Sequence, residues 1–153
     1  MFFPDKAKGV REAFRILRPG GTYLLSVWAK IEENAICRIA HDTFRAFFPD
    51  DPPQLYQIPF SLHDTAAVRA LLTDAGFGDV ACVTVEKVGR SPSAADAAIG
   101  LVEGNPVYGS IMERRPEALP DIKAAVAQKI AEELGDHPVR CRLRAHVFTG
   151  IRL

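Results

Sequence analysis

Apolar residues recur at two different spacings at the start of the chain, and each spacing predicts a different element. Intervals of three and four predict a helix with one apolar face over about 5–18. The positions that set this pattern are Ala7, Val10, Phe14 and Leu17. Residues 22–28 are almost continuously apolar, as expected for a strand covered on both faces in a parallel sheet. Between the two elements, Pro19 and Gly20 predict a type II turn.

The same patterns predict six further elements. We expect helices over about 34–47, 64–75, 93–103 and 122–134, a strand over about 80–88, and a last strand that begins at Val139. Helix starts are marked by Asn34, by Asp64, and by Ser93 with Asp96 at capping-box spacing. Gly76, Gly104 and Gly135 are expected just past helix ends.

The last strand, "VRCRLRAHV", alternates strictly between apolar and polar positions. Its apolar side would hold Val139, Cys141, Leu143, Ala145 and Val147, and its polar side Arg140, Arg142, Arg144 and His146. Such clean alternation indicates a strand that runs antiparallel to its neighbours. The order of helices and strands predicts an α/β fold with a small sheet, and no repeat or second domain boundary interrupts the single domain expected over 1–153.

Charge and composition exclude several classes of function. The chain has 153 residues and a formal net charge of +0, so no overall field attracts nucleic acid or an anionic membrane. No apolar run has the length of a membrane span, and Met1 to Pro4 lack the basic start of a signal peptide, so we expect a cytoplasmic protein. The three cysteines are widely spaced and form no CxxC pair, which favours reduced thiols.

Candidate catalytic chemistry is sparse. None of the four histidines pairs with a cysteine, serine or carboxylate at the spacing of a triad or a metal cluster, so we assign no catalytic residue and no metal ligand. The row of Arg140, Arg142 and Arg144 is either an anion-binding strip or a solvated face paired with acidic neighbours.

Three segments carry a resemblance to a known family. "FRILRPGGTYLLSVW" resembles the helix, turn and fifth strand of class I S-adenosylmethionine-dependent methyltransferases, the group that includes the small-molecule type 11 enzymes. "LLTDAGFGDVACVTVE" resembles the helix and sixth strand of that fold, and "MFFPDKAKGVREAFRILRPGG" is similar to the segment that follows the fourth strand. The last strand would be the seventh, inserted between the fifth and sixth. The resemblance therefore implies a partial Rossmann-like methyltransferase fold with strands in the order 5, 7, 6.

The sequence departs from the family where the cofactor is held. The family uses a glycine-rich loop after the first strand and an acidic residue at the end of the second, because glycines admit the ligand to the backbone and a carboxylate binds ribose hydroxyls. Gly20 and Gly21 precede a strand, and Gly76 and Gly78 mark a helix end, so neither feature can be placed. The chain thus resembles the C-terminal half of such an enzyme.

The resemblance also implies positions for a partial site. Met1, Phe2 and Phe3 would lie beside the adenosine and methionine parts of S-adenosylmethionine, and Trp28 would face the small-molecule methyl acceptor. Core packing is the alternative role of these apolar residues.

Two functions are compatible with this pattern. The chain is either part of a methyltransferase that is inactive or partner-dependent by itself, or a non-enzymatic binding or oligomerisation module derived from the same fold. Because the fourth strand is absent, the strand at 22–28 would have an unpaired edge, which a second copy or a missing N-terminal half would cover. We therefore expect a homo-oligomer, with a homodimer as its simplest form.

Overall fold

The structure is a computed structural model that describes residues 2–52 and 56–153. Its backbone divides into two compact units, each built from separate stretches of chain. Unit 1 comprises Met1–Lys30, Gln57–Glu86 and Arg144–Leu153, and unit 2 comprises Ile31–Tyr56 and Lys87–Leu143. The single domain expected over 1–153 stays a prediction.

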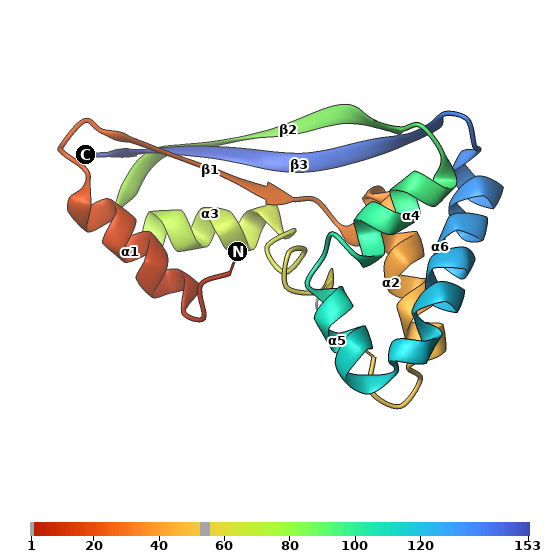
Figure 1. Cartoon of the computed structure of the whole chain (residues 1–153). Coiled ribbons are helices and arrows are strands. Elements are labelled where there is room, and N and C mark those ends of the chain that lie inside the picture. Colours follow the sequence, from red (N-terminus) through yellow and green to blue (C-terminus); the bar gives the residue numbers. More distant parts are fainter. Residues whose placement is uncertain (1, 53–55) are drawn as a thin grey trace. The chain divides into compact units, whose positions relative to one another are not determined.

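Three strands form the sheet in the order β1-β3-β2. They are β1 (Thr22–Trp28), β2 (Phe77–Ser91) and β3 (Val139–Arg152). The last strand in sequence is thus the middle strand in space, and it runs antiparallel to β1 with Thr22 opposite Ile151 and Trp28 opposite Ala145. Figure 1 shows β3 running against both neighbours. The predicted order 5, 7, 6 and the antiparallel last strand are confirmed.

In unit 1, two helices cover one face of the sheet, α1 (Lys6–Ile16) and α3 (Thr65–Asp74) (Figure 1). The core between these layers is fully apolar, and its buried members are Val27, Val68, Leu72, Phe77 and Phe148. The Phe77 ring stacks on Tyr23 with ring centroids 5.3 Å apart and meets Phe14 edge-on at 5.1 Å. These offset and edge-on arrangements are the ones that aromatic quadrupoles favour, so Phe77 anchors the core.

The prediction that β1 is covered on both faces is wrong for the described residues. Burial alternates along the strand: Tyr23, Leu25 and Val27 face the helices, whereas Leu24 is 63% exposed and Ser26 is also exposed. The apolar run misled the prediction because Leu24 keeps the exposed face apolar. A continuous apolar run therefore did not indicate a two-sided core here.

Burial along β3 follows the predicted alternation in only one part of the strand. In unit 2 the odd-numbered Val139 and Cys141 are buried, as expected. In unit 1 the even-numbered Phe148 is fully buried, on the side that the sequence assigned to polar residues. The strand also continues to Arg152, beyond the alternating segment, so the pattern located the strand but not the buried side of its second half.

The predicted turn and most predicted helix ends are confirmed. The Gly21 N–H donates to the Arg18 carbonyl at 2.8 Å, and Gly20 has φ 77°, as a type II turn after Pro19 requires. Asp64 caps α3 by accepting from two backbone N–H groups, and Gly76 follows that helix with φ 102°. Asn34 stands at a helix start but makes no capping hydrogen bond through its side chain.

Unit 2 is mainly helical. Its elements are η1 (Ile31–Glu33), α2 (Ala35–Phe47), α4 (Ala94–Val102), α5 (Val107–Arg114), η3 (Pro116–Ala118) and α6 (Leu119–Leu134). Helix α6 packs against both α2 and α4, burying Ile122, Val126 and Ile130 along one side. Helix α5 was not predicted, because its eight residues, VYGSIMER, contain a glycine and have no side-chain cap.

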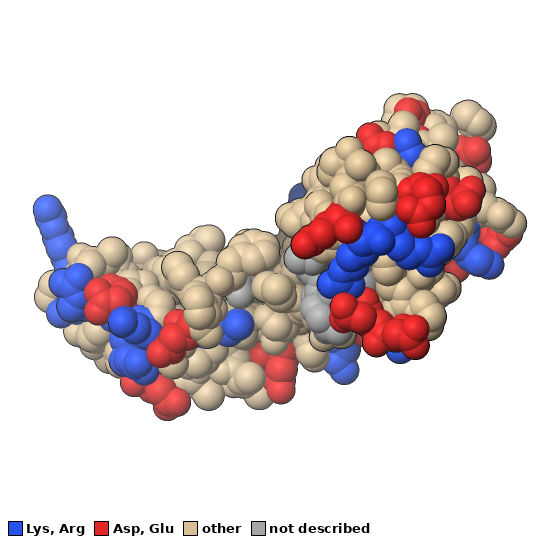
Figure 2. Space-filling model, turned by 60° about the horizontal axis from the view of Figure 1, so that its bottom comes forward, with Lys and Arg blue, Asp and Glu red and all other residues tan. Residues whose placement is uncertain are grey.

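The surface of the described residues carries both signs of charge. Figure 2 shows basic and acidic side chains next to one another on the face that it draws. In unit 2, for example, Arg114 pairs with Asp51 at 3.0 Å and Arg115 with Glu117 at 3.6 Å. None of the helices in the described parts of the chain is long and apolar enough to cross a membrane.

Candidate functional site

Phe2 and Phe3 precede α1, whose first turn is capped by the Asp5 carboxylate accepting from the Lys8 N–H at 2.7 Å. The two side chains are 73% and 60% exposed, so neither belongs to the core. The Phe3 ring lies against Gly9, where a Cβ atom would come within 2.6 Å of a ring carbon. Met1 lies outside the described residues.

A small cavity opens beside Phe3 and β1 in unit 1. Its volume is about 80 Å³. Its walls are mainly apolar and come from α1, β1, α3 and the segment before α3, and they include Phe3, Val10, Tyr23, Leu25, Leu62 and Leu72. Lys6 and Ser26 are the polar residues at its wall. The cavity can therefore hold only a small apolar group.

The cavity beside Phe3 is not by itself a binding site for S-adenosylmethionine. Sites for ligands of that size usually measure about 300–1,000 Å³, well above the volume of this cavity. No aspartate or glutamate of the described chain lines it, so ribose hydroxyls would find no carboxylate acceptor. The glycines of the turn precede β1 and serve backbone geometry, as the φ of Gly20 shows.

Trp28, the single tryptophan of the chain, ends β1. Its half-buried ring lies 6.1 Å from the Phe60 ring, measured between centroids. Trp28 is not among the residues that line the cavity beside Phe3. The structure thus places Phe3 at a cavity and Trp28 in an aromatic pair, without joining them in one site among the described residues.

A second cavity, which the sequence did not indicate, lies within unit 2. Its volume is about 320 Å³, within the range of small-molecule sites. Small and apolar residues from α2, β2, α4 and β3 form most of its wall, including Ile36, Gly89, Ala97, Gly100, Leu101 and Cys141. Gly89 lies inside β2 and Gly100 inside α4, and glycines at these positions are the sequence signal that could have suggested a space there.

Buried titratable groups lie in the same unit. Burial raises the pKa of the Cys37 thiol to about 11, and the nearby Cys141 thiol adds to the effect. Burial, with Cys37 nearby, also raises the pKa of the Tyr56 phenol, whose hydroxyl donates to the Leu101 carbonyl at 3.2 Å. A raised pKa keeps these groups protonated at neutral pH, so neither is an activated nucleophile.

The structure assigns ordinary contacts to several polar residues that the sequence singled out. Arg144 pairs with Glu86 at 3.8 Å, which supports pairing with an acidic neighbour at that position of the arginine row. His146 Nδ1 lies 3.0 Å from the Thr84 hydroxyl, and His63 Nδ1 lies 2.8 Å from the Phe60 carbonyl. Among the described residues, no group of three or more histidines, cysteines or carboxylates is placed to hold a metal ion.

The chain is similar in sequence to a curated protein. The chain is 33% identical over 95 residues to a protein of Aspergillus niger named Methyltransferase ktnA. The match covers 56% of this chain and 29% of the relative, so the chain spans less than a third of the length of the curated relative that it matches. No family model matches the chain.

Among solved structures, the chain is similar to a candidate methyltransferase of Bacillus halodurans. The TM-score is 0.44 at 17% identity, over 98% of this chain and 59% of that chain. The similarity to methyltransferases is carried by the sequence match and by the strand order. The chain is similar in sequence to a methyltransferase, and its sheet has the strand order that the resemblance to the C-terminal part of a class I methyltransferase predicted.

Proposed function

We propose that the chain is part of an S-adenosylmethionine-dependent methyltransferase that acts on a small molecule in the cytoplasm. The observation that supports the proposal best is the 33% identity to a methyltransferase over 95 residues. The strand order β1-β3-β2 agrees with the fifth, seventh and sixth strands of that fold. Methyl transfer needs few protein groups, because the sulfonium cofactor is itself a strong electrophile and the enzyme mainly positions the acceptor.

By itself the chain would be inactive or dependent on a partner. The described residues provide an 80 Å³ apolar cavity near Phe3, which supplies neither the volume nor the carboxylate that the cofactor needs. The rest of the cofactor site would come from a partner or an N-terminal half that carries a glycine-rich loop. Phe2 and Phe3 would then contact the cofactor, and Trp28 would contact the methyl acceptor.

Calorimetric titration with S-adenosylhomocysteine, the product form of the cofactor, tests this proposal. We expect no saturable heat from the folded 153-residue chain at millimolar ligand. The nucleotide sequence upstream of the Met1 codon should encode a strand followed by a glycine-rich loop. Coexpression of that segment with the chain should produce one-site binding. Absence of such a segment in every frame would leave a separate partner chain as the source of the loop, whereas saturable binding by the chain alone would contradict its dependence on a partner.

A matched pair of variants then tests the role of Trp28 in the coexpressed complex. Trp28→Phe keeps a ring that can pack on Phe60, whereas Trp28→Ala removes it. If Trp28 contacts the acceptor, Trp28→Ala should raise the KM for the acceptor without changing the affinity for S-adenosylhomocysteine. If Trp28→Ala weakened the binding of the acceptor and of S-adenosylhomocysteine to the same extent, Trp28 would only stabilise the fold.

A non-enzymatic binding or oligomerisation module is the second candidate. The observation that favours it is the position of β1, which pairs with β3 on one side and lies at the margin of the sheet formed by the described residues. Persistent absence of S-adenosylhomocysteine binding, together with a stable oligomer, would favour this candidate over the enzyme.

A further inference from the structure

The outer edge of β1 exposes a regular set of backbone groups. At the two ends of the β1–β3 pair, Arg152 donates to the Gly21 carbonyl at 2.9 Å and Ala29 donates to the Arg144 carbonyl at 3.1 Å. Hydrogen-bonded and non-hydrogen-bonded pairs alternate in an antiparallel ladder, so the odd-numbered residues of β1 direct their N–H and C=O groups toward β3. The even-numbered residues 22, 24, 26 and 28 direct theirs outward, away from the sheet.

This edge lacks the features that normally prevent strands from pairing. The sequence of β1, TYLLSVW, contains no charged residue and no proline. Charged side chains, prolines and bulges are the usual means by which proteins protect an exposed edge. The edge of β1 is therefore competent to accept another strand.

The side chains next to the edge are apolar and incompletely covered. Tyr23 and Leu25 face the helices of unit 1 but are only partly buried, and both line the 80 Å³ cavity. A strand added to this edge would place its helix-facing side chains next to Tyr23 and Leu25. An occupant with apolar residues at alternate positions would thus extend the core.

We propose that the chain forms a two-fold symmetric dimer in which β1 pairs antiparallel with β1 of a second copy, centred on Leu25. In this register Leu25 lies opposite Leu25 of the second copy, and Tyr23 lies opposite Val27. The outward-facing backbone groups of Leu24 then meet those of Ser26 in the second copy, so hydrogen-bonding positions match as well. The strand is complementary to itself in both its backbone groups and its apolar face, and the two three-stranded sheets become one.

The mass of the folded 153-residue chain in solution is the first test. Sedimentation velocity or light scattering should give about twice 16.8 kDa, with dissociation on dilution. A mass of 16.8 kDa throughout the concentration range up to several hundred micromolar would overturn the proposal. The measured mass does not depend on cofactor binding, so the test of the dimer is independent of the test of the proposed methyltransferase function.

Charge variants at two exposed positions test the surface and the register together. Leu24 and Ser26 have exposed side chains, so replacing them should leave the fold of one copy intact. In the proposed register, Leu24→Lys with Ser26→Lys places lysine opposite lysine twice. Leu24→Lys with Ser26→Glu places lysine opposite glutamate twice.

We expect the double-lysine variant to raise the dissociation constant of the dimer at least about tenfold relative to the lysine–glutamate variant. Circular dichroism should show both variants folded. If both variants formed a dimer as stable as that of the parent chain, the copies would associate through another surface. Weakening of both variants to the same extent would place the two-fold axis at residue 24 or 26 instead of Leu25. Either result would overturn the proposal.

Discussion

Leu25 of β1 lies directly opposite Phe148 of β3 on the helix-facing side of the sheet in unit 1. Phe148 is fully buried, whereas Leu24, one position earlier in the same strand as Leu25, is 63% exposed on the other side. Adjacent positions of one edge strand thus differ sharply in what they contribute to folding. The contrast follows from the two-residue repeat of a strand that is covered on one face.

Replacing Phe148 by alanine should strongly destabilise the protein. Removal of a fully buried phenylalanine costs about 3–5 kcal/mol in free energy of unfolding, because transfer and cavity terms add. Leu24→Ala is the control, and its expected effect is within about 0.5 kcal/mol. Urea unfolding monitored by circular dichroism measures both. Equal losses for the two variants would contradict the assignment of the buried face.

Two glycine-to-alanine variants should change stability in opposite directions. Gly76 has φ 102°, and an added Cβ would lie 3.0 Å from the Phe14 ring, so Gly76→Ala should destabilise by at least about 1 kcal/mol. Gly100 lies inside α4 with open space around its Cβ position. Gly100→Ala should stabilise by about 0.5–1 kcal/mol, because alanine is the better helix former. Thermal unfolding of the two variants beside the parent chain checks the signs.

Stability should fall at alkaline pH because of Cys37. Burial raises the pKa of its thiol from 9.0 to about 11 in the folded chain, so the unfolded chain loses this proton at lower pH. The stabilisation is complete below pH 9 and is lost as pH rises to about 11. Over this range the free energy of unfolding should fall by about 2 kcal/mol. Under reducing conditions, the Cys37→Ala variant should lose less stability than the parent between these pH values. If the stability of the parent and of the Cys37→Ala variant fell in parallel with rising pH, Cys37 would make no contribution to the alkaline loss of stability.

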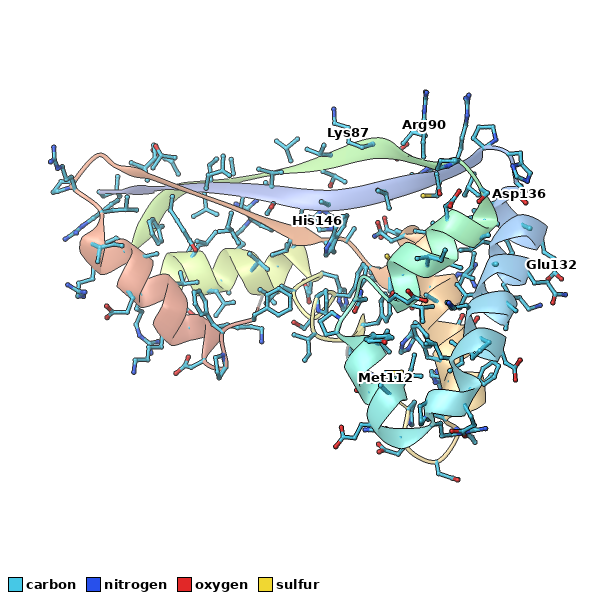
Figure 3. All side chains as sticks on the ribbon, viewed as in Figure 1. Lys87, Arg90, Met112, Glu132, Asp136 and His146 are labelled. Atoms are coloured by element: carbon cyan, nitrogen blue, oxygen red, sulfur yellow. The ribbon has the colours of Figure 1, made fainter. Side chains whose placement is uncertain are left out.

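Asp136 should stabilise the start of α4 from a distant part of the sequence. Its carboxylate accepts from the Ala94 N–H at 2.7 Å and from the His137 N–H at 2.9 Å, and Figure 3 shows Asp136 just beyond the end of α6. The first of these bonds lowers the pKa of Asp136 below 3.8. The stabilisation is present above that pH and is lost as the carboxylate is protonated at lower pH.

Two variants of Asp136 separate the contribution of its hydrogen-bond acceptor from that of its negative charge. Asp136→Ala should lower the melting temperature at pH 7 more than Asp136→Asn, which keeps an acceptor oxygen. The Asn variant should also show a flatter dependence of melting temperature on pH in the acid range. Equal melting temperatures for parent and Ala variant would exclude a role in capping α4.

The sequence predicted features that depend on neighbouring residues. Ser93 accepts from the Asp96 N–H at 3.0 Å as expected, although the Asp96 carboxylate bonds the Ser93 hydroxyl instead of the Ser93 N–H. Gly135 follows α6 as predicted, with φ 82°. Local patterns contain this information because turns and caps are built from residues a few positions apart.

Features that depend on distant residues could not be predicted in the same way. Asp136 contacts Ala94 across 42 positions, and no local pattern marks that pair. The exposed face of β1 and the cavity beside Phe3 depend on which elements cover the strand. The cavity in unit 2 depends on how α2, α4 and two strands meet. These features depend on packing between distant segments, and the spacing of apolar residues along the sequence carries no information about that packing.

The central place of β3 in the sheet sets the order in which the protein can fold during its synthesis. β1 and β2 leave the ribosome before β3, but they are not neighbours in the sheet, and each pairs with β3. Thr22 pairs with Ile151, almost a full chain length away. Such non-local pairing is slow to form, since long loops must close first. Until the fourteen residues of β3 emerge, both earlier strands remain available to chaperones and to other nascent chains.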